Sequence, residues 1–103
     1  MNNNIDYQNR QVLYLIQALL GVISNNMKAI SVEFSGQEVT IHFFLENENP
    51  HDREEINDFG AEYEALQERS VHYEISTHIV KNQKEYLELP GRVIYLKRLD
   101  EIN

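Results

Sequence analysis

The feature that most constrains this fold is a pair of strictly alternating segments in the first half of the chain. In the first, Ile30, Val32 and Phe34 alternate with polar residues. In the second, which spans 39–45, alternate residues are Val, Ile, Phe and Leu. A period of two places successive side chains on opposite faces of a strand. Because a short Gly-containing turn (35–37) joins the segments, they predict a β-hairpin with one buried face.

Helical periodicity flanks this hairpin. From about Asp6, a plausible N-cap, to Asn25, apolar residues recur at i, i+3, i+4 and i+7, which predicts the main core helix. Its stripe comprises Val12, Leu13, Ile16, Leu19, Leu20 and Ile23, widened by Leu15 and Val22. A second helix is predicted from about His51 to Glu68, after the turn 47–50. In it, Gly60 beside the apolar stripe predicts a close approach to the sheet.

Two more strands complete the predicted fold. Residues 70–81 alternate again, and 92–97 follow a polar connection that ends in Leu-Pro-Gly. The order α-β-β-α-β-β predicts an α+β protein with a four-stranded, mainly antiparallel sheet and both helices on one face. A chain of 103 residues has a common domain size, so we expect one domain over 1–103. The residues expected deepest in its core are Ile16, Leu20, Ile41 and Phe43.

The amino-acid composition limits the classes of partner that this protein can be expected to bind. Seventeen acidic against nine basic residues give a formal charge of −8. Nucleic-acid binding requires clustered Lys and Arg, and an acidic protein is repelled by anionic membranes, so neither partner is expected. A protein with a basic surface is the partner that such a charge attracts over distance. The competing interpretation is that the acidity serves solubility alone.

Cysteine and targeting signals are both missing from the printed sequence. Without cysteine, neither a disulfide framework nor a thiolate metal site can form. Residues 1–4 lack the basic segment of a signal peptide, and the apolar stretch 12–23 is too short and interrupted to span a bilayer. These features predict a cytoplasmic protein.

The histidines are one set of residues that could support catalysis or metal binding. His42, His72 and His78 fall on the strand faces opposite the Val and Ile residues, as do Glu33 and Glu74. Such a set can bind zinc or transfer protons, but the same alternation also describes solvent-facing residues. The chain has no H-E-x-x-H, G-x-S-x-G or glycine-rich phosphate motif. We therefore expect no metal, no cofactor and no catalytic residue, with the histidines facing solvent.

The densest charge lies on the second predicted helix and the turn before it. Paired carboxylates can hydrolyse glycosides, but that requires an apolar pocket that an exposed helix does not provide. Like charges at i+3 and i+4 weaken a helix, and a basic partner would relieve them. A solvated helix face is the alternative. The predicted partner-binding residues are Glu46, Glu48, Asp52, Glu55, Asp58 and Glu62, and Glu85 and Glu88 are the next candidates. Tyr86, on a polar loop, can anchor an interface, but half-buried packing is the favoured interpretation.

Three stretches of the chain carry a family resemblance. Val39–Glu46, Asn49–Ile56 and Glu62–Leu66 resemble small bacterial immunity proteins encoded with the toxins of contact-dependent growth inhibition systems, and the likeness extends weakly to Gly91–Tyr95. This resemblance implies a protein that binds a cognate toxin, often a basic nuclease, and blocks its active site. It transfers no catalytic or contact residue.

Three hypotheses follow from the sequence. The leading one is a cytoplasmic immunity protein that inhibits a toxin, a nuclease by expectation, through stoichiometric binding. The second is a small adaptor or regulatory module that binds another basic protein. The third is a metal-dependent hydrolase that uses the sheet histidines.

Overall fold

The computed structural model describes residues 3–80 and 89–97 of the chain. Its elements follow the predicted order: α1 (Asn3–Ala18), β1 (Met27–Ser35), β2 (Glu38–Leu45), α2 (Pro50–Ala65), β3 (Tyr73–Ile79) and β4 (Arg92–Leu96). The strands form one sheet in the order β3-β2-β1-β4. β1 is antiparallel to β2 and β4, whereas β2 and β3 are parallel because α2 connects them as a crossover. The predicted α+β class and element order are confirmed.

The hairpin of β1 and β2 is the centre of the sheet. Ser35 pairs with Glu38, so the loop between the strands has only two residues. Gly36 opens this loop at φ 63, a left-handed conformation that glycine adopts without steric cost. The hairpin was predicted correctly because alternation and turn chemistry are local signals.

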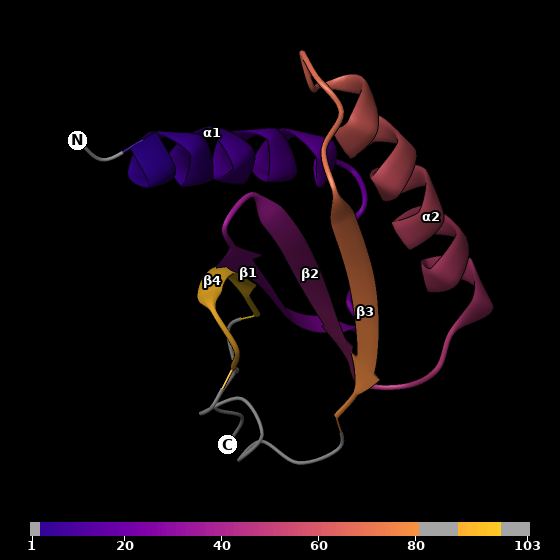
Figure 1. Ribbon diagram of the computed structural model, residues 1–103. Coiled ribbons are helices and arrows are strands. Elements are labelled where there is room, and N and C mark those ends of the chain that lie inside the picture. The colour runs from indigo at the N-terminus through magenta and orange to yellow at the C-terminus, as the bar shows by residue number, and fades with distance from the viewer. Residues whose placement is uncertain (1–2, 81–88, 98–103) are drawn as a thin grey trace.

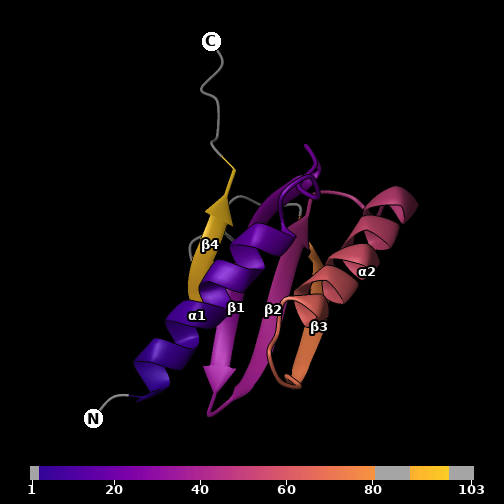
Figure 2. The same cartoon turned by 90° about the horizontal axis from the view of Figure 1, so that it is seen from above.

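Both helices cover the same face of the sheet, with α1 beside β1 and β4 and α2 beside β2 and β3 (Figures 1 and 2). The main buried cluster joins α1, α2, β1 and β2. Within it, the rings of Phe43 and Phe59 meet edge to face with centroids 5.2 Å apart. At Gly60 an added Cβ would lie 3.1 Å from the Tyr73 hydroxyl oxygen, so the predicted close approach of α2 to the sheet is present.

The buried face of α1 differs from the predicted one. Ile16 and Leu20 are 46% and 76% exposed, whereas Leu15 and Leu19 are buried. The other two expected core residues, on β2, are fully buried as predicted. α1 also ends at Ala18, before a turn at Gly21, rather than near residue 25. The error has a physical cause. Residues 12–20 are apolar nearly all round the helix, so helical periodicity fits two different apolar stripes equally well.

The second face of the sheet is partly covered as well. Ala29, Phe44 and Val80 form a small buried cluster there, and Leu89 packs against it. The connection that contains Tyr86, Glu85 and Glu88 lies outside the described residues. In the ranges 3–80 and 89–97, no helix is long and apolar enough to cross a membrane.

Candidate functional site

The predicted partner-binding residues lie at the β2–α2 turn and along α2. Local chemistry fixes where α2 begins: Asn49 is its N-cap in an extended conformation, and its side-chain oxygen accepts a hydrogen bond from the Asp52 backbone nitrogen at 3.0 Å. Pro50 takes the first helical position, where its missing N–H costs nothing. The turn is therefore joined to the first turn of α2 by a capping hydrogen bond.

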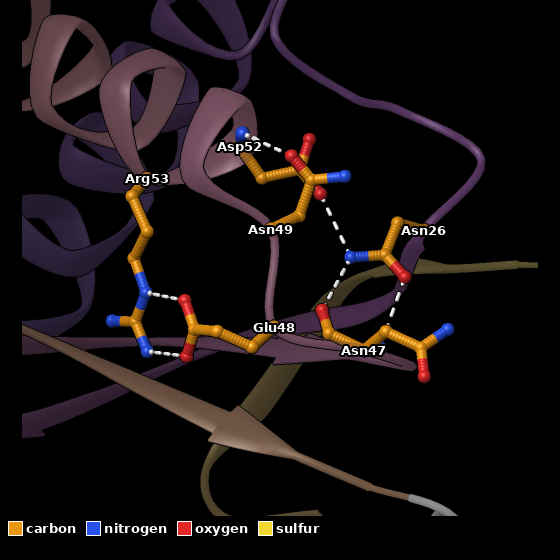
Figure 3. Close-up of polar contacts among 6 residues, drawn as sticks. All are labelled: Asn26, Asn47, Glu48, Asn49, Asp52 and Arg53. Atoms are coloured by element: carbon orange, nitrogen blue, oxygen red, sulfur yellow. Dashed lines mark hydrogen bonds and ion pairs between the residues drawn. The ribbon is translucent and has the colours of Figure 1, made fainter.

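Asp52 does not lie on the exposed acidic surface with the others. It is only 2% exposed, and its carboxylate accepts a hydrogen bond from the Asn26 side-chain amide at 2.8 Å (Figure 3). The same amide donates to the Asn47 carbonyl at 2.7 Å, and the Asn26 oxygen accepts from the Asn47 backbone at 3.0 Å. This network ties the α1–β1 connection to the start of α2. Asp52 thus has a structural role. Its predicted position on an exposed helix face is wrong, while its part in partner binding stays a prediction.

Glu46 and Glu48 are exposed, but each forms an ion pair with a basic residue of the protein. The Lys28 amine lies 2.7 Å from a Glu46 carboxylate oxygen. Arg53 makes two contacts of 2.6 Å with Glu48, in a fork-to-carboxylate arrangement (Figure 3). Hydrogen bonding to Lys28 lowers the pKa of Glu46, and hydrogen bonding to Arg53 lowers that of Glu48. Both stay ionised, but a basic partner must compete with these internal cations.

Glu55, Asp58 and Glu62 form the outward acidic ridge of α2. Their spacing of three and four residues places them along one side of the helix. Asp58 and Glu62 are exposed and Glu55 is half-buried. Among the described residues, none forms an ion pair with any of the three. The ridge therefore presents unneutralised negative charge to solvent.

The structure contradicts the predicted solvent exposure of His42 and confirms that of His72. His42 is only 9% exposed, so it is not solvent-facing. Its Nε2 lies 2.6 Å from a Glu33 carboxylate oxygen and its Nδ1 lies 2.9 Å from Nε2 of His78. Burial, followed by the nearby His42, lowers the pKa of His78. His72 is exposed, lies before β3 and is not part of this chain of contacts.

Two protons are enough to satisfy both contacts of His42. If His42 donates from Nε2 to Glu33, its Nδ1 accepts from the Nε2–H of His78, so each contact has one proton. His42 lies between its two partners and spends both nitrogens on them, so the three groups do not converge on one point. Within the described part of the chain, no group of three His, Asp or Glu residues could hold a metal ion.

A polar cleft of about 410 Å³ between α1 and the α2–β3 connection was not predicted. Tyr63 donates from its hydroxyl to the Gln11 side-chain oxygen at 2.5 Å, and Gln11 and Gln67 exchange hydrogen bonds at 3.0 Å. Burial raises the pKa of Tyr63, so it remains a neutral donor. The only sequence signal was a glutamine at a core-facing position of a helix. Among the residues that line the cleft, Gln11 and Gln67 satisfy each other, and Tyr63, which does not line it, donates to Gln11. This arrangement favours a structural role for these three side chains.

The described residues form a small α+β protein with an exposed acidic ridge on α2 and no group of residues that could hold a metal ion. The chain belongs to the MafI2 immunity protein family, whose model matches residues 8–98. It is therefore a non-enzymatic inhibitor that neutralises a cognate toxin. No curated protein matches the chain. The expectation of an immunity protein is thus confirmed at the level of the family, which also sets aside the hydrolase hypothesis.

Proposed function

We propose that the protein neutralises its toxin by binding a basic surface through the acidic ridge of α2, with Glu46 and Glu48 at the edge of the interface. The toxin is, in this proposal, a nuclease of a contact-dependent growth inhibition system, and binding takes place in the cytoplasm of the producing cell. A nuclease carries a cationic surface for its phosphate substrate, which complements the charge of this protein.

The observation that carries the proposal is the unneutralised charge of the ridge. Asp58 lies three residues from Glu55 and four from Glu62, so the ridge contains like-charged neighbours that weaken α2 by a few tenths of a kcal/mol per pair. No described cation offsets this repulsion. Lys or Arg side chains of a toxin would offset it on binding, so the repulsion becomes part of the driving force for association.

The two paired glutamates support the proposal in a different way. Glu48 and Arg53 are both about half exposed, so their pair is screened by water and contributes little to folding. A toxin cation can approach the outer side of the same carboxylate without fully displacing Arg53. Such edge charges mainly affect the rate of encounter rather than the lifetime of the complex.

The decisive experiment measures association with the product of the adjacent toxin gene as a function of ionic strength. The test variant is Glu55→Gln/Asp58→Asn/Glu62→Gln. The matched control is Asp6→Asn/Glu38→Gln/Glu74→Gln, which removes the same charge from exposed residues of other elements. Both variants change the net charge from −8 to −5, by neutralising three carboxylates.

The test variant should associate about 10-fold or more slowly at low salt, with a flatter salt dependence, while the control stays near the wild type. Equal slowing in both variants would mean that net charge alone steers the toxin. An unchanged rate in the test variant would remove α2 from the interface. The adaptor hypothesis predicts no binding to the adjacent toxin at all, and the family assignment favours immunity over it.

A further inference from the structure

Two arginines without an ion pair line the polar cleft between α1 and the α2–β3 connection. Among the residues that the structure describes, six are Lys or Arg. Four of these form ion pairs or hydrogen bonds with other described residues: Lys28, Arg53, Arg92 and Lys97. The other two, Arg10 and Arg69, form neither with any described residue, and both line this cleft. We propose that the cleft binds a carboxylate side chain of the toxin.

The fold brings these two arginines to one place. Arg10 lies on α1 and Arg69 on the connection from α2 to β3, and both are exposed. His72 also lines the cleft and adds a ring N–H that can donate a hydrogen bond. Glu68 is the single acidic residue among those lining the cleft, and it forms no ion pair with a described residue. The cleft is therefore a cationic site on a protein whose net charge is −8.

Hydrogen bonds between separate elements hold the sides of the cleft together. The Tyr7 hydroxyl donates to the Gln37 carbonyl at 2.7 Å, which joins α1 to the loop between β1 and β2. Gln11 and Gln67 exchange hydrogen bonds at 3.0 Å, which joins α1 to the end of α2. None of these contacts uses an arginine. The entropy cost of binding therefore falls mainly on the arginine side chains rather than on the elements that carry them.

The chemistry of the cleft suits an anionic group. A guanidinium presents a planar fork of N–H donors that matches the two oxygens of a carboxylate, and two such forks can share one carboxylate. A volume of about 410 Å³ admits a whole side chain. The toxin is the source of this group because the family assignment gives the protein a toxin as its partner. The inference rests on the proposed function for that partner alone and does not require the acidic ridge.

The cleft and the ridge would contact opposite charges of the toxin. Glu62, the last residue of the ridge, lies in the final turn of α2, shortly before Gln67 at the cleft. A basic group of the toxin is attracted to the ridge, whereas an acidic group is repelled by it and attracted to the arginines. A toxin docked in the reverse direction would place like charges together. The two neighbouring surfaces therefore fix the orientation of the toxin as well as its affinity.

Dissociation of the toxin complex tests the cleft. The variants are Arg10→Gln and Arg69→Gln, and the matched control is Arg92→Gln, which alters an exposed arginine of β4. Each changes the net charge from −8 to −9 by removing one positive charge. Each cleft variant should dissociate about 10-fold faster with an unchanged thermal midpoint, while the control stays near the wild type. Association with a basic toxin should not slow, because every variant is more acidic than the wild type.

A zero-length cross-link identifies the group that the cleft holds. A carbodiimide activates a carboxylate, and a lysine amine in contact with it then displaces the activating group to form an amide. In the toxin complex, Arg69→Lys should give a peptide that joins residue 69 to an Asp or Glu of the toxin. The control Arg92→Lys should give no such peptide through residue 92. Mass spectrometry of the digested complex distinguishes these peptides from links through the native lysines.

Three results would overturn the proposal. The first is wild-type dissociation of both cleft variants, and the second is equally fast dissociation of Arg92→Gln. The third is tight binding of inorganic phosphate to the isolated protein, lost in Arg10→Gln/Arg69→Gln, while toxin dissociation stays unchanged, which would show a site for small anions. Neutralising the ridge changes association, whereas the cleft variants change dissociation, so the two proposals can fail separately.

Discussion

Asp52→Ala should destabilise the protein far more than Asp58→Ala, although both remove a carboxylate from the same helix. Asp52 is buried and accepts the Asn26 amide at 2.8 Å, whereas Asp58 is exposed. A hydrogen bond to a charged group contributes about 1.5–3 kcal/mol. The position of Asp52 in the first turn of α2 adds about 0.3–1 kcal/mol through the helix dipole. The gain in helix propensity from Asp to Ala is shared by both variants, so it cancels in the comparison.

The expected difference between the two variants is therefore about 2–3 kcal/mol, a large part of the roughly 5–15 kcal/mol that stabilises a domain of this size. It corresponds to a fall in thermal midpoint on the order of 10 °C. Urea unfolding gives the free energies, and a double-mutant cycle with Asn26→Ala isolates the contact between the two side chains. Its coupling energy should be on the order of 1 kcal/mol.

The same pair of variants separates folding from recognition. Asp52→Ala should associate with the toxin at nearly the wild-type rate when the concentration of folded protein is matched, whereas Asp58→Ala should associate more slowly and unfold at nearly the wild-type midpoint. The reasoning fails if the two variants have equal unfolding free energies, or if the Asn26 and Asp52 effects are strictly additive. Equal free energies would show that the buried position of Asp52 adds no net stability, and strict additivity would show that its contact with Asn26 adds none.

Two further predictions concern the core and the histidine contacts. Leu15→Ala should cost about 2–5 kcal/mol in urea unfolding by leaving a cavity, whereas Ile16→Ala should cost well under half as much; equal losses would mean that the buried face of α1 is wrong. Burial, followed by the nearby His42, holds the pKa of His78 below its ordinary 6.5 in the folded protein, so the unfolded chain binds its proton more readily. Stability should therefore fall as pH drops below about 6.5, and His78→Gln should lose part of that pH dependence; identical profiles for the two proteins would contradict the assignment.

The sequence by itself determined the elements whose signals are local. Alternation and a glycine turn defined the hairpin of β1 and β2, and turn chemistry at residues 47–50 defined the start of α2. The expected burial of Ile41 and Phe43 followed from the same alternation. A strand has only two faces, and the apolar one is the face that packs against the core. The acidic character of α2 was equally evident, since helix residues three and four apart are neighbours whatever surrounds them.

Only the tertiary structure decided which residues are buried where the local sequence allows two equivalent arrangements. α1 is apolar on two sides, so its periodicity alone could not show whether Leu15 or Ile16 is buried. Leu15 is buried because its side of the helix packs against the sheet. Asp52 is chemically like Asp58, but Asn26, far away in the sequence, meets it at the start of α2 and removes it from the surface. His42 likewise became buried because residues of β1 and β3 lie on either side of it. Contacts between distant residues have no periodic signal in the sequence, so they follow only from the packing of the whole chain.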